Sequence, residues 1–414
     1  MKTSIQFSRG STGSRRFFLG HCVTVLLLSM VTCIGLPQES FGKTIAVEGW
    51  NSEGGGDRNQ FFVTARFIDP ATEEYTYPGA LSPDKTYYSN VEQMVYNSAI
   101  NAIQSHQTVN LLGYSHGAVA VLNVLKRLDS EGVSLANVSV ITVDEVINVL
   151  GFAKYPLKNP AKSVPPGVGR ALNIYQRKEK SASGAQVRRA LNIDASQVLV
   201  NELTAGRSID QEDPLFWPDY GSYHIYIQGS LAVRRRILEA FAVPYLGGIW
   251  QFAHTDCANN NASVYVLNHD SDGVFTARRY VSRPGFTSSN VFHGNVTQAE
   301  NLLLTGAFQL VAYAPDCPNL GYTWITGSLT GSATASGRSL NMDLQETMPV
   351  YDPTTCEWLG TVPCDGAIQG TVLYAMSPSM SSSAAMTGGD SSEQAIAPSA
   401  VGVPAQCLPF QPEH

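Results

Sequence analysis

Three residues of this chain are of the types that carry out nucleophilic catalysis: Ser115, Asp144 and His224. A serine hydroxyl attacks a carbonyl carbon efficiently only when a neighbouring base removes its proton. A carboxylate can hold a histidine in the tautomer that acts as this base. Ser115 lies between Gly113 and Gly117 in a Gly-x-Ser-x-Gly pattern. The three residue types therefore predict acyl transfer through a covalent intermediate on Ser115.

The residues around Ser115 predict a strand, a tight turn and a helix. An apolar run covers 108–112, and apolar residues at helical spacing cover 118–128. A turn this tight strains the serine backbone, and side chains two residues before and after it would clash unless both are glycine. The backbone N–H of His116, at the start of the helix, would then donate to an oxyanion. A glycine-rich turn with a solvent-facing serine is the alternative.

Asp144 and His224 are assigned from their surroundings in the sequence. A β-branched run over 138–143 predicts a central strand, which places Asp144 at the edge where an active-site crevice opens. We expect His224 in a loop between a late strand and a final helix over 231–241. Asp144 could instead cap the next loop, and His224 could be a half-buried histidine of an aromatic loop.

The Gly-x-Ser-x-Gly pattern and the chain order Ser115, Asp144, His224 resemble those of secreted α/β-hydrolases of the lipase and esterase type. The resemblance covers residues 43–243. It implies a mostly parallel sheet flanked by helices, with Ser115 as nucleophile, His224 as general base and Asp144 as orienting acid. It also implies that neither a metal nor an organic cofactor is needed.

The same resemblance places a second oxyanion donor just after the first strand, at the amide of Trp50 or Asn51. The chain departs from the pattern at two positions. Glu48 stands where many lipases have histidine, and Glu145 stands where several have proline after the acid. Glu179 is the alternative triad acid, because the more usual acid position follows the next strand.

The remaining chain predicts an α/β region followed by a smaller β-rich region. In the α/β region, over 43–243, we expect a strand in 43–51 that runs into Gly49, further strands at 61–68, 171–176 and 196–203, and a helix over 91–106. From 244 to 376, short alternating segments predict an antiparallel sandwich or barrel. Its aromatic residues either pack a core or form a face for carbohydrate, lipid or the cell envelope. The uncharged, low-complexity segment 377–414 predicts a loosely attached tail.

The N-terminal segment predicts export. Residues 1–42 combine basic residues, no acid before an apolar core, and a Ser14-Arg15-Arg16 sequence that resembles a twin-arginine signal. We expect cleavage after Gly42 and a periplasmic or extracellular bacterial protein; a retained N-terminal anchor is the alternative.

The number of cysteines and the net charge limit which disulfides, metal sites and partners are expected. Five cysteines remain beyond residue 42, so at most two intrachain disulfides form, and Cys356 and Cys364 could close a small loop. No cysteine pair has zinc-site spacing. The net charge of −7 and the charged fraction of 15% argue against nucleic acid or an anionic membrane as a partner.

These observations predict an exported serine hydrolase that cleaves small-molecule or lipid carboxylic esters. Two alternatives remain at this stage. The same fold could hydrolyse amides or peptides or transfer acyl groups. The chain could also be a non-catalytic surface or binding protein with a decayed hydrolase domain. The sequence does not decide its oligomeric state.

Overall fold

The computed structural model describes most of the chain between Gly42 and Met376. The described residues are 42–49, 60–77, 85–145, 162–178, 184, 186–204, 223–255, 260–279, 290–298, 301–313, 317–320, 322–334 and 336–376. The predicted tail over 377–414, and all of the predicted signal peptide except Gly42, lie outside them. No helix in these ranges is both long enough and apolar enough to cross a membrane.

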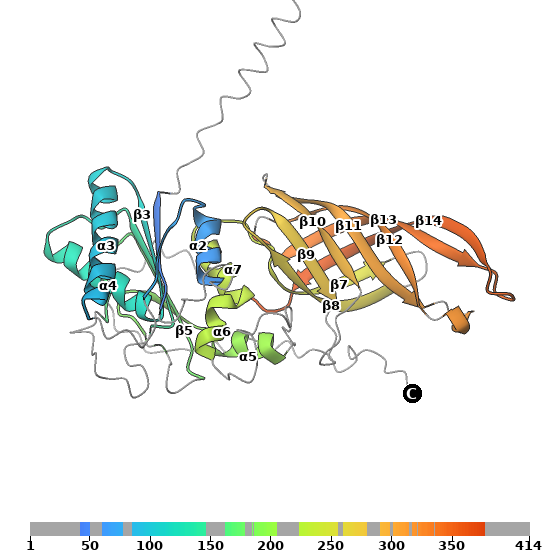
Figure 1. Cartoon of the computed structure of the whole chain (residues 1–414), viewed down its shortest axis with the longest axis horizontal. Coiled ribbons are helices and arrows are strands. Elements are labelled where there is room, and N and C mark those ends of the chain that lie inside the picture. The colour runs from blue at the N-terminus through green and yellow to red at the C-terminus, as the bar shows by residue number, and fades with distance from the viewer. Residues whose placement is uncertain are drawn as a thin grey trace, which may run out of the picture. The chain divides into compact units, whose positions relative to one another are not determined.

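The first half of the described chain is built on a six-stranded, fully parallel sheet in the order β2-β1-β3-β4-β5-β6 (Figure 1). The inner strands are almost entirely buried, as expected for a parallel sheet that is covered on both faces. The strands are β1 (Lys43–Val47), β2 (Glu73–Tyr75), β3 (Val109–Tyr114), β4 (Val138–Val143), β5 (Arg170–Tyr175) and β6 (Leu191–Asp194).

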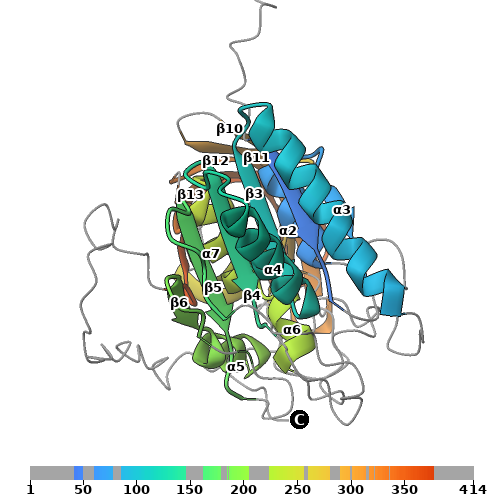
Figure 2. The ribbon, with the colours of Figure 1, turned by 90° about the vertical axis from the view of Figure 1, so that its left-hand side faces the viewer.

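Helices cover both faces of this sheet. Two of them, α3 (Lys85–Gln104) and α4 (His116–Ser130), pack on one face, in front of the strands in Figure 2. The opposite face carries four helices, whose buried side chains form a second core with the other face of the strands. They are α2 (Gln60–Ile68), α5 (Ser196–Thr204), α6 (Tyr223–Gly229) and α7 (Leu231–Ala240).

Two segments predicted as strands are helices. The segment 61–68 is β-branched and aromatic in part, which suggested a strand, but Phe61, Ala65 and Ile68 are buried at helical spacing as part of α2. The segment 196–203 belongs to α5, whose start is stabilised by a hydrogen bond from the Ser196 N–H to the Asp194 carboxylate, at 2.9 Å. In both segments the packing against the sheet outweighs the β propensity.

The second half is a closed antiparallel barrel of eight strands, in the order β10-β11-β12-β13-β14-β7-β8-β9. Of the two architectures expected, the structure therefore selects the barrel. Inward-facing aromatic and aliphatic side chains fill its interior, and the rings of Phe252, Tyr265 and Phe292 contact one another. The strands are β7 (Gly248–Thr255), β8 (Asn260–His269), β9 (Val274–Arg279), β10 (Val291–Gln298), β11 (Leu302–Tyr313), β12 (Tyr322–Ala333), β13 (Ser339–Tyr351) and β14 (Trp358–Val372).

A buried arginine connects the last helix of the α/β region to the barrel. Arg235 of α7 donates hydrogen bonds to the carbonyl oxygens of Tyr245, at 3.0 Å, and Gly247, at 2.7 Å, just before β7. It also donates to the carbonyl oxygen of Gly337, before β13. Burial lowers the pKa of Arg235 to about 10, so the side chain is still charged at neutral pH. Carbonyl oxygens of the segment before β7 and of the loop before β13 thus solvate this buried cation of α7.

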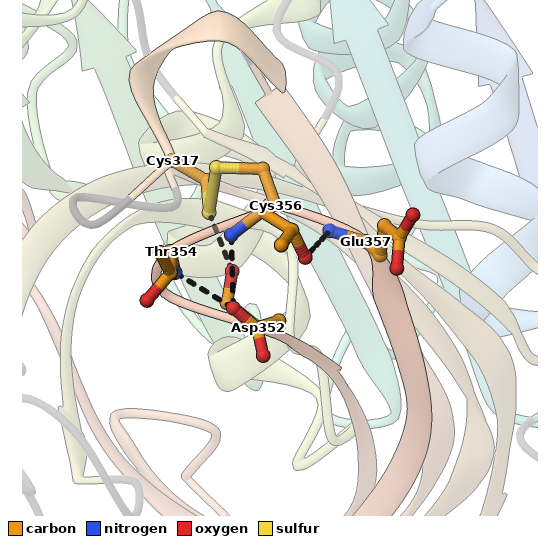
Figure 3. Close-up of a disulfide and its surroundings, with 6 residues drawn as sticks. Cys317, Asp352, Thr354, Cys356 and Glu357 are labelled. Atoms are coloured by element: carbon orange, nitrogen blue, oxygen red, sulfur yellow. Dashed lines mark hydrogen bonds between the residues drawn. A yellow bond between two sulfur atoms is a disulfide. The ribbon is translucent and has the colours of Figure 1, made fainter.

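The disulfide pairing differs from the expected one. Cys356 bonds to Cys317, with 5.5 Å between their Cα atoms, and does not close a loop with Cys364 (Figure 3). Cys364 lies in β14, where it is also disulfide-bonded. The antiparallel pairing of β13 with β14 brings Cys364 opposite Glu346, away from the turn that carries Cys356. The predicted disulfide between Cys356 and Cys364 is therefore wrong, because the strand pairing separates these two cysteines.

Candidate active site

Ser115 lies between β3 and α4, at the predicted tight turn. Its φ of 56° and ψ of −122° fall in a region that L-residues rarely adopt, at a cost of about 1–3 kcal/mol. The flanking glycines are required by space. A Cβ on Gly113 would lie 2.5 Å from the Gly117 carbonyl oxygen, and one on Gly117 would lie 2.0 Å from the Val47 carbonyl oxygen. The predicted clash on both sides of the serine is therefore confirmed.

The structure brings Ser115, His224 and Asp144 together in one hydrogen-bonded chain. His224 Nε2 lies 2.9 Å from Ser115 Oγ, and His224 Nδ1 lies 2.7 Å from Asp144 Oδ2. The side chain of Asp144 is fully buried and that of His224 is 14% exposed. This geometry fits the tautomer in which Nδ1 donates its proton to the carboxylate and Nε2 accepts the serine hydroxyl.

Asp144 follows β4 directly, as predicted, and further donors hold its carboxylate in place. Gln176 donates its side-chain amide to Oδ2, at 3.0 Å, and its backbone N–H to Oδ1, at 3.2 Å. The backbone N–H of Gly184 donates to Oδ1 at 2.7 Å. Together with His224, these bonds satisfy a buried charge that would otherwise be strongly destabilising. Glu179, the alternative acid, lies outside the described residues.

His224 is not in a loop. It is the second residue of the short helix α6, which packs among α2, α5 and α7. The hydroxyl of Tyr114 donates to the His224 carbonyl oxygen at 2.7 Å, and the two rings stack with centroids 5.1 Å apart. Tyr114 immediately precedes Ser115, so one strand end positions both the serine and the imidazole. The predicted loop is wrong because tertiary contacts stabilise this single helical segment.

Tyr114 and Gln176 are the site residues that sequence reasoning missed. A signal for Gln176 existed: it follows β5 as Asp144 follows β4, and the carboxyl ends of neighbouring parallel strands meet at one edge. Tyr114 lay inside the recognised pattern, but its partner is 110 residues away. A contact over this sequence distance cannot be predicted from a local pattern.

The space next to the serine is shaped by Gly49, two residues after β1. A Cβ on Gly49 would lie 2.8 Å from Ser115 Oγ and 3.4 Å from the backbone nitrogen of His116. The missing side chain therefore leaves room beside the hydroxyl and beside the first N–H of α4. Helix N-termini offer N–H groups without intrahelical partners, which suits a developing oxyanion. Trp50 and Asn51, the predicted second donors, lie outside the described residues.

Two further carboxyl groups lie at the same edge of the sheet. Glu48 follows β1 and Glu145 follows Asp144; each is 2% exposed. Burial raises the pKa of Glu145 to about 7, and the positive charge of Lys162 offsets this only in part. Among the described residues, Oε1 of Glu145 has no hydrogen-bond partner. These are the positions at which the chain departs from the lipase pattern.

The three residues also lie where this topology places ligand sites. The strand order continues from β3 to β6 on one side, whereas β2 lies beyond β1 on the other. The order therefore reverses between β1 and β3, and crevices form at such switch points at the carboxyl ends of the strands. Gly49 and Ser115 follow these two strands. Within the described ranges, no three histidine, cysteine or acidic side chains are grouped so that they could hold a metal ion.

Comparison with known proteins does not identify a family or a function for this chain. No protein-family profile matches the chain, and no curated protein matches it significantly, so a functional assignment depends on the site itself.

Proposed function

We propose that this protein is an exported serine hydrolase with an α/β-hydrolase-like fold that cleaves carboxylic esters. One observation carries the proposal: the continuous contact from Ser115 Oγ through the His224 imidazole to the buried Asp144 carboxylate. The strained backbone of Ser115 and the four groups that bind Asp144 support it, because strain and buried charge persist where the surrounding structure maintains them.

The contacts define a balanced sequence of steps. Ser115 Oγ attacks the ester carbonyl carbon while its proton passes to His224 Nε2, and the His116 N–H stabilises the resulting oxyanion. The intermediate collapses: the C–O bond to the alcohol breaks, and His224 returns the proton to the departing oxygen. Water then attacks the acyl-enzyme with His224 again as base, which releases the acid and restores Ser115.

Asp144 does not exchange a proton in this scheme. Its carboxylate keeps Nδ1 protonated and balances the positive charge that forms on the imidazole when Nε2 takes the serine proton. The hydrogen bonds from Gln176 and Gly184 fix the carboxylate, and so they also fix the plane of the imidazole. No metal or organic cofactor enters any step.

Export is part of the same proposal. The signal-like segment at 1–42 and the disulfide between Cys317 and Cys356 both fit an oxidising compartment, such as the periplasm or the outside of a bacterial cell. Mass spectrometry of protein recovered from periplasmic and culture fractions tests this. A mature chain that begins near Lys43 supports export with cleavage, and an intact N-terminus in the cytoplasm contradicts it.

The hydrolase proposal is tested with a fluorophosphonate probe and with a panel of short- and long-chain esters. We expect labelling and turnover in the wild type and neither in Ser115→Ala. For Asp144→Asn we expect turnover about 10,000-fold lower, because the amide supports the wrong imidazole tautomer. The control Ser130→Ala changes an exposed serine of α4 and should behave as wild type. A wild type that neither labels nor turns over esters contradicts the proposal and favours a binding protein.

The same panel separates ester hydrolysis from the other reactions that this site could catalyse. Amides and peptides use the same acyl-enzyme, and an alcohol or amine added in excess can replace water as the acceptor. Rates on matched ester and amide substrates therefore decide between these reactions. Faster turnover of the amide would identify an amidase or peptidase, and preferential transfer to the added acceptor would identify an acyltransferase. Both would use the same acyl-enzyme mechanism.

A further inference from the structure

The pairing of the last two strands leaves a two-stranded arm beyond the closed part of the barrel (Figure 1). β12 pairs with β13 only up to Thr347, and β7 pairs with β14 only from Ala367 onward. Among the described residues, Met348–Tyr351 and Trp358–Val362 therefore pair only with each other. Within the described residues, neither outer edge of this ribbon pairs with another strand.

Large apolar side chains are concentrated at this arm and at the end of the barrel that carries it. Among the described residues, nine large hydrophobic side chains are exposed, and five of them lie here. On the arm, Trp358 is 65% exposed, Leu359 63% and Val362 47%. Trp324 on β12 and Leu320 beside Cys317 complete this group, which we call the apolar tip. Single exposed apolar residues are common on protein surfaces, but a cluster marks an interaction site.

A disulfide and several hydrogen bonds fix the turn of the arm. The disulfide between Cys317 and Cys356 attaches the end of the arm to the short 3-10 turn Pro318–Leu320 (Figure 3). In the turn of the arm, the Asp352 carboxylate accepts the backbone N–H groups of Thr354, at 2.8 Å, and Thr355, at 2.9 Å. The Cys356 N–H donates to the Asp352 carbonyl oxygen at 2.8 Å. The tip is thus preorganised, which reduces the entropy lost on binding.

The arrangement of the exposed side chains distinguishes between kinds of partner. Trp358 lies opposite Tyr351 and Val362 lies opposite Met348. Because Met348 and Tyr351 are three residues apart on β13, the side chains of Trp358 and Val362 point to opposite faces of the ribbon. A folded protein or a polysaccharide would cover one face and leave the other apolar side chain in water. A fluid lipid phase surrounds both faces at once, and tryptophan favours the boundary between lipid and water.

Charge distinguishes between kinds of lipid surface. The sequence from 339 to 376, which includes the whole arm, has no lysine or arginine, and the turn of the arm carries Asp352 and Glu357. Anionic lipids attract basic segments and would repel this one. The tip therefore suits a surface without net charge.

We propose that the apolar tip inserts into a neutral lipid surface and anchors the protein there. The inserted side chains are those of Trp358, Leu359 and Val362, with Trp324 and Leu320 at the level of the interface. The cystine at the base of the turn keeps these side chains from packing back on the barrel. The proposal concerns binding and does not depend on the hydrolase activity.

The test uses the full mature chain and sedimentation with vesicles of ether-linked phosphatidylcholine, which has no ester bond to cleave. We expect the wild type to bind and the double variant Trp358→Ala/Leu359→Ser to bind at least about tenfold more weakly, because most of the inserted apolar area is removed. The matched control is Leu303→Ser, which removes a side chain that is 47% exposed at the opposite end of the barrel strands. This control should bind as the wild type does.

Four results would overturn the proposal. Absence of binding to phosphatidylcholine vesicles excludes a neutral lipid surface as the partner. Binding that requires added phosphatidylglycerol shows an electrostatic mode at another site. Equal binding by the double variant and the wild type excludes the tip. Light scattering is run in parallel: a dimer that dissociates in the double variant would show that the tip binds a second copy of the chain.

Discussion

Tyr114 and His224 are 110 residues apart in the chain, yet the Tyr114 hydroxyl donates to the His224 carbonyl oxygen at 2.7 Å and its ring stacks on the imidazole. The residue that precedes Ser115 thus also positions His224. Because the hydroxyl binds the backbone of α6 and the ring packs against the imidazole, Tyr114 restrains His224 in two independent ways. In this arrangement His224 Nε2 lies 2.9 Å from Ser115 Oγ.

Tyr114→Phe separates these two restraints, since it removes the hydroxyl and keeps the ring. We expect kcat for ester turnover to fall about tenfold with KM unchanged, because the imidazole is less well oriented. The free energy of unfolding should fall by about 1 kcal/mol. Tyr75→Phe, which removes a hydroxyl bound to Glu73, is the control and should leave kcat unchanged. A lower kcat in both variants would argue against a specific positioning role.

Gly49→Ala tests the open space beside the nucleophile. A Cβ at this position would lie 2.5 Å from Ser115 Cβ and 2.8 Å from Oγ, so the serine must shift. We expect the rate of fluorophosphonate labelling to fall about 100-fold, which is the usual effect of a displacement near 1 Å. Gly132→Ala is the comparison, because its added Cβ would meet no atom within 4 Å although its φ is +74°. Gly132→Ala should lose about 1 kcal/mol of stability and none of the labelling rate.

Glu145 should make the protein less stable as the pH rises. Its folded-state pKa of about 7 lies above the ordinary value of 4.5 because the side chain is buried. Between these values the folded state binds more protons than the unfolded state, so the free energy of unfolding falls with rising pH. Glu145→Gln should therefore gain up to about 3 kcal/mol relative to wild type between pH 4.5 and pH 8. Urea unfolding at both pH values measures this gain, and a constant difference contradicts it.

His269 should have the opposite pH dependence. Burial, together with the positive charges of Arg234 and Arg235, lowers its pKa to about 4 from an ordinary value of 6.5. The unfolded state then binds more protons between pH 4 and 6.5, so stability is lost as the pH falls through this window. We expect His269→Gln to lose less stability than wild type between pH 7 and pH 4.5. Urea unfolding at several pH values checks this, and parallel curves for the two proteins would contradict it.

The sequence by itself determined the local features of the site. The Gly-x-Ser-x-Gly pattern placed Ser115 at a strained turn because the close approach of Gly113 to the Gly117 carbonyl oxygen is local. The close approach of Gly117 to Val47 is visible only in the fold. The β-branched run before Asp144 likewise placed that carboxylate at the end of β4. The change in periodicity near residue 244 separated the helical part of the chain from the all-β part. These features depend on near neighbours in the chain, which a pattern can record.

Only the tertiary structure decided which distant groups meet. The helical state of α2, α5 and the segment around His224 depends on packing that outweighs local propensity, so the local sequence predicts strands or a loop there. The hydrogen bonds of Tyr114 and Gln176 and the pairing of Cys356 with Cys317 join residues that are 32 to 110 positions apart. Strand register and the closure of the barrel determine these contacts. No short stretch of sequence carries that information, because each contact depends on how the whole chain packs.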